Sequence, residues 1–396
     1  MSSPRVLIAA GGTGGHVFPA LAVAQELDRC GWHAEWVGTD RGLEARVIPT
    51  AGFTLHILRF TGLRGKGLAA WLTLPLRLMR ALLDARDIVK RVRPSVVVAF
   101  GGYVTFPVGL AARWLRIPLC IHEQNAVMGS ANRWLSKIAQ AVMVSFPGTR
   151  HAPLGAALVG NPVRAAIAQV EAPQARYAAR TGAIRILVMG GSLGASVMNQ
   201  QLPLAFQVAV ERGARLEVWH QTGTRDLAAV QATYQQLGID ARCTAFIDEV
   251  PAAYAWADLL ICRAGASTVS EVALAGVAAL FIPLPHAIDD HQSANARTLS
   301  DRGAAWLLTQ SACTPQALGE RLAGLDRAAL AQLATLAASQ GMPQAAQQAA
   351  SLVAATAGSP LEVKHVEPGE PQQAQQVHEM RETQKPQSQT QQERQP

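Results

Sequence analysis

The chain has 396 residues, a length that predicts two domains. Its hydrophobic content of 49% with only 5% aromatics is typical of an α/β enzyme. The five cysteines are scattered, odd in number and without a C-x-x-C pair, which argues against a disulfide framework or a zinc site and favours a reducing compartment.

The net charge of +7 is unevenly distributed along the chain. Residues 1–163 hold 18 Lys and Arg against 8 Asp and Glu, whereas residues 164–396 hold 17 against 20. The basic half predicts an anionic partner, either nucleic acid or anionic lipid. Two long uncharged stretches, at residues 94–112 and 272–288, are interrupted by Gly and Pro, so we expect neither to span a bilayer.

The first half is organised around a glycine-rich loop between a predicted strand and a predicted helix. The apolar run at residues 6–10 is typical of a strand buried on both faces, and a helical apolar stripe follows Pro19. Between them lie GGTGG at 11–15 and then His16. This arrangement brings bare backbone N–H groups up to a phosphate-bearing ligand. The alternative interpretation is a tight turn without a ligand.

A segment rich in leucine and arginine, at residues 68–94, predicts a helix interrupted at Pro75. Apolar residues occupy nearly its whole circumference, with cations interleaved between them. One interpretation is a core helix with solvated cations; the other is a helix with one face in the core and another at a membrane surface. The residues expected at that surface are Leu68, Trp71, Leu72, Leu76, Arg77, Met79 and Arg80.

Polar side chains follow a predicted strand at residues 117–121. His122, Glu123, Gln124 and Asn125 come directly after it. Open α/β sheets bind ligands at the carboxyl ends of their strands, so the sequence predicts a ligand site there.

The second half repeats the plan of the first. A strand at residues 185–189 leads to a glycine loop at 190–195, and further strands are expected near 216–220, 244–247, 258–262 and 278–283. We expect an N-terminal Rossmann-like domain at residues 1–163 and a C-terminal one at 164–342. A helix at about 343–357 is expected to pack back on the first domain, and a Gln-rich tail at 359–396 to be disordered.

Nine short motifs, spread over residues 5–357 in the same order, resemble those of the MurG family of glycosyltransferases. They are GGTGGH at 11–16, TGLRGKG at 61–67, GGY at 101–103, HEQN at 122–125, GNPVR at 160–164, GGSLGA at 190–195, FID at 246–248, RAGASTVSE at 263–271 and HQSANA at 291–296.

The resemblance implies an α/β GT-B fold, with two Rossmann-like domains facing each other across a cleft. It implies a hexosyltransferase that moves N-acetylglucosamine (GlcNAc) from UDP-GlcNAc to the 4-hydroxyl of the muramoyl sugar of lipid I. The product is lipid II for peptidoglycan, and the anomeric configuration inverts. No cofactor and no metal are expected, since helix amino termini and Arg164 suit a diphosphate leaving group and the chain has no Asp-x-Asp motif.

Site residues follow from matching the family motifs position by position. Glu271 is expected to accept hydrogen bonds from the ribose hydroxyls, and the alternative is a carboxylate that merely balances a helix dipole. Ile247 is expected at the uracil, and Asn125 and Gln292 at the donor sugar. The full set of expected substrate-binding residues is Thr13, Gly14, Gly15, Asn125, Arg164, Ser192, Ile247, Ala266, Ser267, Thr268, Val269, Ser270, Glu271 and Gln292.

An inverting transfer needs a base for the attacking hydroxyl. His16 is the candidate, because a histidine near its ordinary pKa of ~6.5 takes up a proton at neutral pH. Glu123 is the rival. Without the family context, His16 would be interpreted as a structural or phosphate-facing group.

Two other functions stay open: a UDP-sugar 2-epimerase of similar fold, and a non-enzymatic nucleotide-binding scaffold at the membrane. The expected partners are UDP-GlcNAc, lipid I, an anionic membrane surface, and cell-wall synthesis and division proteins, but no nucleic acid. The expected location is the cytoplasmic face of the inner membrane, as a peripheral protein.

Overall fold

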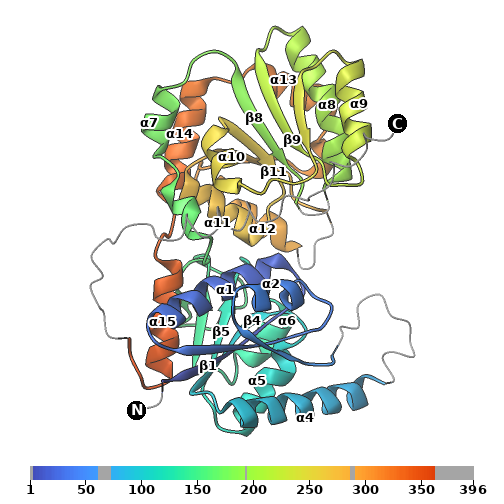
Figure 1. Cartoon of the computed structure of the whole chain (residues 1–396). Coiled ribbons are helices and arrows are strands. Elements are labelled where there is room, and N and C mark those ends of the chain that lie inside the picture. The colour runs from blue at the N-terminus through green and yellow to red at the C-terminus, as the bar shows by residue number, and fades with distance from the viewer. Residues whose placement is uncertain (1–2, 61–72, 192–193, 286–289, 362–396) are drawn as a thin grey trace, which may run out of the picture. The chain divides into compact units, whose positions relative to one another are not determined.

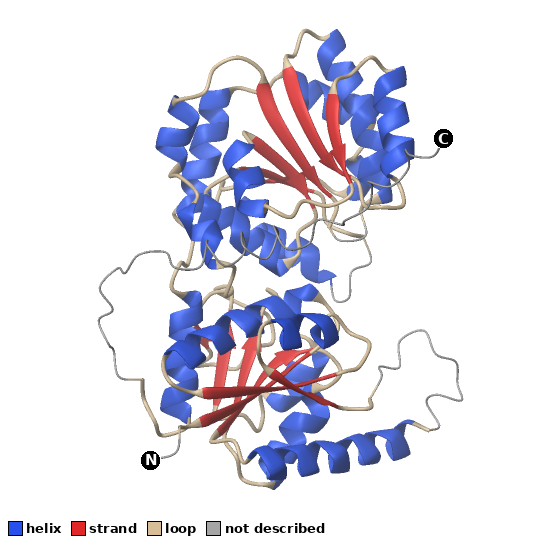
Figure 2. Cartoon of the chain, in the orientation of Figure 1, coloured by secondary structure: helices blue, strands red, loops and turns tan. Residues whose placement is uncertain are grey.

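The computed structural model describes residues 3–60, 73–191, 194–285 and 290–361, whose strands form two sheets (Figures 1 and 2). Every strand pair in both sheets is parallel. The first sheet has the order β3 (Thr54–Ile57), β2 (His33–Gly38), β1 (Arg5–Ala10), β4 (Val96–Gly101), β5 (Leu119–Glu123), β6 (Ala141–Val144) and β7 (Ala157–Leu158). The second has the order β10 (Ala241–Thr244), β9 (Leu216–Gln221), β8 (Ile184–Met189), β11 (Leu259–Cys262), β12 (Ala278–Phe281) and β13 (Trp306–Leu307).

Helices cover both faces of each sheet, as the blue ribbons of Figure 2 show. In the first half these are α1 (Gly14–Arg29), α2 (Glu44–Thr50), α4 (Leu74–Val92), α5 (Thr105–Trp114) and α6 (Ser130–Leu135). The second half has η1 (Ala165–Gln169), α7 (Pro173–Ala178), α8 (Ser196–Glu211), α9 (Leu227–Gln236), α10 (Val250–Trp256), α11 (Ala266–Ala275), α12 (His291–Ser300), η3 (Gln310–Ala312), α13 (Pro315–Ala323), α14 (Arg327–Ala338) and α15 (Ala345–Thr356).

Strand alternation divides the apolar core of the first sheet between its two faces. In β1, Val6 and Ile8 pack in one cluster with α1, whereas Leu7 and Ala9 pack in another with α4 and α5. The helix α15 contributes Val353, fully buried, to the cluster on the α1 face. The last described helix therefore completes the core of the first sheet (Figure 1).

The structure corrects three predicted elements. The helix α4 begins at Leu74, so Pro75 lies in its first turn, where proline is tolerated, and does not interrupt it. The strand β5 runs through His122 to Glu123 rather than ending at residue 121. The strand β10 ends at Thr244, which leaves Ile247 in the loop before α10.

The two-residue strands β7 and β13 were not predicted, although short apolar runs at residues 156–159 and 304–308 surround them. No helix among the described residues is long and apolar enough to cross a membrane.

Candidate functional site

Two glycine pairs pack against each other at the carboxyl ends of β1 and β4. Gly102 has φ +90°, and a Cβ at this position would clash with the carbonyl oxygen of Gly11. Gly101 has φ +110°, and a Cβ there would lie 2.6 Å from Nδ1 of His16. Both positions need a residue without a side chain, for conformation and for space. The predicted glycine loop is also shorter than expected, because α1 begins at Gly14.

The His16 side chain projects from the first turn of α1 and joins a chain of hydrogen bonds. Its Nδ1 lies 2.9 Å from Oε1 of Gln124, and Nε2 of Gln124 lies 3.0 Å from Nδ1 of His122. The other ring nitrogen of His122 lies 3.0 Å from the carbonyl oxygen of Gly160. Burial lowers the pKa of His122 to about 4, partly opposed by its hydrogen bond to Gly160. His122 is therefore a neutral, fully buried member of this chain.

Glu123, the rival base, points to the other side of the strand and braces the loop that follows β5. Its Oε1 accepts from the backbone N–H and the side-chain amide of Asn125, at 3.0 and 3.2 Å. Its Oε2 accepts from Gly129 N at 3.0 Å and from Nδ2 of Asn132 at 2.8 Å. With four amide donors on a carboxylate that is 2% exposed, Glu123 is engaged in holding the loop.

Asn295 on α12 links the two halves of the described chain, and sequence reasoning did not single it out. Its Oδ1 accepts from Ala126 N at 2.8 Å, and its Nδ2 donates to Oδ1 of Asn125 at 3.2 Å and to Ala264 O at 3.1 Å. Asn125, predicted at the donor sugar, is thus held by partners from both halves. The HQSANA motif contained Asn295, but a contact 170 residues distant leaves no local signal.

Glu44 is a second residue that sequence reasoning missed. It is fully buried, and its Oε2 accepts from Gly12 N at 3.0 Å while Oε1 accepts from the backbone N–H and hydroxyl of Thr39, at 3.0 and 2.7 Å. These bonds tie the first glycine loop to the loop after β2. Glycines at 38 and 42 leave room for the carboxylate, and their spacing before Glu44 was the available signal.

In the second half, the structure brings the predicted residues Glu271 and Arg164 together. Nη2 of Arg164 lies 3.5 Å from Oε1 of Glu271, and the hydroxyl of Tyr254 donates to Oε2 at 2.9 Å. Burial raises the pKa of Glu271, opposed by Arg164 and by the hydrogen bond from Tyr254. Glu271 lies in the second turn of α11, past the residues at which a helix dipole acts most strongly.

The other residues predicted around the donor lie on the same helix or in nearby loops. Ala266 and Thr268 lie in the first turn of α11, and the buried Oγ of Ser267 has no hydrogen-bond partner among the described residues. Gln292 lies in the first turn of α12, where its Oε1 accepts from Leu284 N at 2.9 Å. Ser192 lies outside the described residues.

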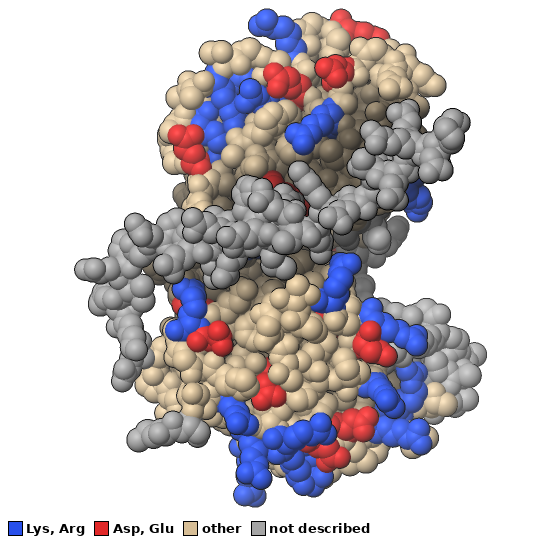
Figure 3. Space-filling model, in the orientation of Figure 1, with Lys and Arg blue, Asp and Glu red and all other residues tan. Residues whose placement is uncertain are grey.

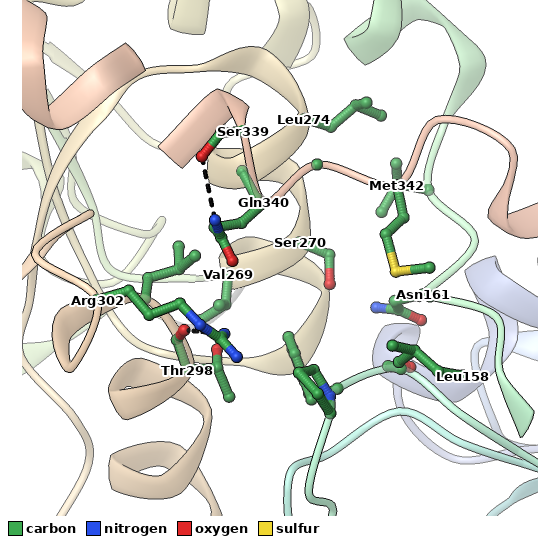
Figure 4. A pocket seen from close by; sticks show the side chains of 18 residues that line it. Leu158, Asn161, Val269, Ser270, Leu274, Thr298, Arg302, Ser339, Gln340 and Met342 are labelled. Atoms are coloured by element: carbon green, nitrogen blue, oxygen red, sulfur yellow. Dashed lines mark hydrogen bonds between the residues drawn. The ribbon is translucent and has the colours of Figure 1, made fainter. Parts of the chain in front are cut away.

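Two cavities are lined by some of the predicted residues. Thr13, His16, Glu123 and Asn125 line a cavity of about 410 Å³, together with His291 and apolar side chains of the first half. Val269 and Ser270 line a different cavity, of about 220 Å³, with Leu158, Asn161, Arg302, Gln340 and Met342 around it (Figure 4). The structure therefore places His16 and Glu123 at one cavity and does not bring Val269 and Ser270 there.

The predicted membrane residues fall on α4 and on the segment before it. Leu76 and Met79 are 61% and 54% exposed, Arg80 is exposed, and Arg77 is half-buried. The other face of the helix carries fully buried Ala81 and Ala85. Figure 3 shows Lys and Arg side chains gathered over the part of the surface that α4 occupies in Figure 1. Leu68, Trp71 and Leu72 lie outside the described residues.

Two parallel-sheet α/β domains, each with a glycine-rich loop after the first strand of its half, have the architecture of the GT-B fold. Residues 6–144 match the glycosyltransferase family 28 N-terminal domain, and residues 185–352 match the family 28 C-terminal domain. The chain belongs to glycosyltransferase family 28.

Curated relatives and a solved structure agree with this assignment. The chain is 50% identical over 358 residues to a UDP-N-acetylglucosamine–N-acetylmuramyl-(pentapeptide) pyrophosphoryl-undecaprenol N-acetylglucosamine transferase of Ralstonia nicotianae, covering 89% of this chain and 97% of the relative. It is 52% identical over 352 residues to the transferase of that name from Bordetella parapertussis, covering 89% and 98%. A crystal structure of MurG from Acinetobacter baumannii superposes with a TM-score of 0.78 at 39% identity, covering 88% of this chain and 99% of that one. These similarities confirm the fold class and the family predicted from the motifs.

Replacing Glu44 tests whether this buried carboxylate holds the glycine loop. Glu44→Ala leaves the N–H groups of Gly12 and Thr39 without their acceptor, so the free energy of unfolding should fall by about 3 kcal/mol or more. Glu44→Gln keeps one acceptor oxygen and should cost less. Urea denaturation measures both, with the exposed Glu211→Gln as control. A Glu44→Ala midpoint equal to the wild-type midpoint would show that the loop does not depend on this carboxylate.

Proposed function

We propose that this chain transfers GlcNAc from UDP-GlcNAc to the 4-hydroxyl of the N-acetylmuramic acid of lipid I, with inversion, to form lipid II. The observation that carries this proposal is the near full-length similarity to transferases named for that donor sugar and that acceptor. The placement of His16 supports it, because this histidine lines a cavity at the carboxyl ends of the first sheet's strands.

The chemistry assigned to the site is a single displacement. His16 takes the proton of the acceptor hydroxyl as its oxygen bonds to C1 of the GlcNAc unit, and the bond from C1 to the diphosphate oxygen breaks. The electron pair leaves with UDP, so negative charge grows on the diphosphate. Arg164 and the amino terminus of α11 are the groups of this chain suited to stabilise that charge.

The proposal extends to the membrane, since the acceptor carries an undecaprenyl chain. The exposed side chains of Leu76, Met79 and Leu83 recur at helical spacing along α4, and exposed cations such as Arg80 and Lys90 flank them. Apolar area and cations together favour reversible attachment to anionic lipid. The proposed location is the cytoplasmic face of the inner membrane, where lipid II formation serves cell shape and division.

An assay that offers donor and acceptor together tests the function directly. The protein is incubated with UDP-GlcNAc and a lipid I analogue, with and without EDTA, and the disaccharide and UDP are quantified. We expect acceptor-dependent disaccharide formation in both conditions. Conversion of UDP-GlcNAc to its 2-epimer without acceptor would instead show an epimerase, and binding without turnover would show a scaffold.

His16→Ala tests the identity of the base. We expect kcat to fall by roughly 10²–10⁴, with the affinity for UDP nearly unchanged, because the base acts in the chemical step. Steady-state kinetics and calorimetry with UDP measure the two effects separately. The assignment reverses if His16→Ala turns over normally while Glu123→Gln, at correct folding by circular dichroism, is inactive.

Glu271→Ala tests the donor site. Loss of two charge-assisted bonds to the ribose should weaken UDP-GlcNAc binding by about 2–3 kcal/mol, measured by calorimetry, whereas the exposed Glu249→Ala should bind normally. Because burial raises the pKa of Glu271, wild-type affinity should decline, as the pH drops, at a higher pH than an ordinary carboxyl group would give. If Glu271→Ala binds UDP-GlcNAc with unchanged affinity, Glu271 does not contact the donor.

Co-sedimentation with vesicles tests the membrane face. A Leu76→Ser, Met79→Ser double variant removes exposed apolar area, so its binding to anionic vesicles at low salt should be at least ~10-fold weaker than that of the wild type. The control is Leu336→Ser, an exposed leucine of the second half. High salt should weaken the vesicle binding of the wild type, the double variant and the control. Equal binding by the double variant and the control would contradict the membrane role of α4 and favour its interpretation as a core helix with solvated cations.

A further inference from the structure

The hydrogen-bond chain that ends at His16 has a direction, and its starting point fixes that direction. The carbonyl oxygen of Gly160 can only accept, so Nε2 of His122, 3.0 Å away, carries a proton and donates it. His122 is fully buried and neutral, so its Nδ1 carries no proton and accepts. The direction of the hydrogen bond from His122 to Gly160 therefore does not depend on how any side-chain amide is oriented.

The side-chain amide of Gln124 lies between His122 and His16, and its orientation is fixed by His122. The group that faces Nδ1 of His122, at 3.0 Å, must be a donor, which is the side-chain NH₂. The second proton of the same NH₂ donates to the backbone oxygen of His122 at 3.1 Å, which locks the amide in place. The carbonyl oxygen of the amide then has to face the other way, toward His16.

His16 receives the last link. Oε1 of Gln124 accepts, so Nδ1 of His16, 2.9 Å from it, carries the ring proton and donates. A neutral imidazole has one proton, so Nε2 keeps its lone pair. The bare backbone of Gly101 lies against the same edge of the ring, where a Cβ would come within 2.6 Å of Nδ1, so the ring can approach Gln124 closely.

We propose that His122 and Gln124 are positioning residues that hold neutral His16 in its Nδ1–H tautomer, leaving Nε2 as the atom that takes the proton from the acceptor hydroxyl. The tautomer follows from the hydrogen bonds together with the burial that keeps His122 neutral, whereas its catalytic meaning rests on the proposed function. Strand alternation supports the division of roles in HEQN: His122 and Gln124 face His16, and Glu123 faces the loop.

Nitrogen-15 NMR of the histidine rings tests this assignment without reference to activity. Two-bond proton–nitrogen correlations in the full chain, at a pH where His16 is neutral, distinguish a protonated from a bare ring nitrogen, and a His16→Gln variant identifies the His16 signals. We expect a protonated Nδ1 and a bare Nε2. A protonated Nε2 in the wild type would overturn the proposal.

Two variants break the chain at different links. Gln124→Met keeps the length of the side chain but removes the acceptor, and His122→Phe keeps a ring stacked on Phe100, 5.1 Å away, but removes both nitrogens. In each, His16 should shift toward the Nε2–H form that free imidazole side chains favour. We expect kcat to fall at least ~10-fold with the donor KM unchanged. Gln124→Glu, which keeps an acceptor for His16, should retain the Nδ1–H form and recover part of kcat.

The control is His220→Phe, which removes another fully buried imidazole, bonded to Tyr234 and Asn199 in the second half. It should lower stability without changing the His16 spectrum. A His16 tautomer that stays Nδ1–H in both Gln124→Met and His122→Phe would refute the positioning role. If the tautomer shifts as expected but no variant or wild type forms disaccharide, the hydrogen-bond chain stands and the proposed function fails.

Discussion

The close approach of two backbones, at Gly11 and Gly102, is the constraint on which the site depends. Any side chain at Gly102 would clash with the carbonyl of Gly11, and any side chain at Gly101 would displace the His16 ring. The approach therefore lets α1 begin directly beside the end of β4, with His16 in its first turn. Glu44 holds the first glycine loop by accepting from Gly12 N. Glycine pairs allow two backbones to approach this closely, whereas residues with a side chain would prevent it.

The sequence predicted the parts of this arrangement that depend on local patterns. The apolar run before GGTGGH forms β1, buried on both faces, and the run before the pair at 101–102 forms β4. Residue type at the carboxyl edge of the sheet marked HEQN as a candidate ligand site, and Glu123 and Asn125 of this motif line a cavity. Local pattern did not show that β5 continues to Glu123, because polar residues within a strand look like the start of a loop.

Long-range partners could not be predicted from one sequence. The bond between His16 and Gln124 spans 108 positions, and the one between Asn125 and Asn295 spans 170. Glu123 was a plausible base by residue type, but its four amide partners appear only in three dimensions. The pairing of Arg164 with Glu271 is of the same kind: each was predicted at the donor, and the structure adds that they contact each other.

We propose that this family 28 enzyme performs one displacement at C1, with His16 as base. The configuration of the new bond tests it most directly. UDP-GlcNAc labelled with carbon-13 at C1 is turned over with a lipid I analogue, and the one-bond carbon–proton coupling of the product is measured by NMR. A single displacement predicts a β linkage from the α-linked donor. An α linkage would require two displacements or front-face attack, and would contradict a single displacement assisted by His16.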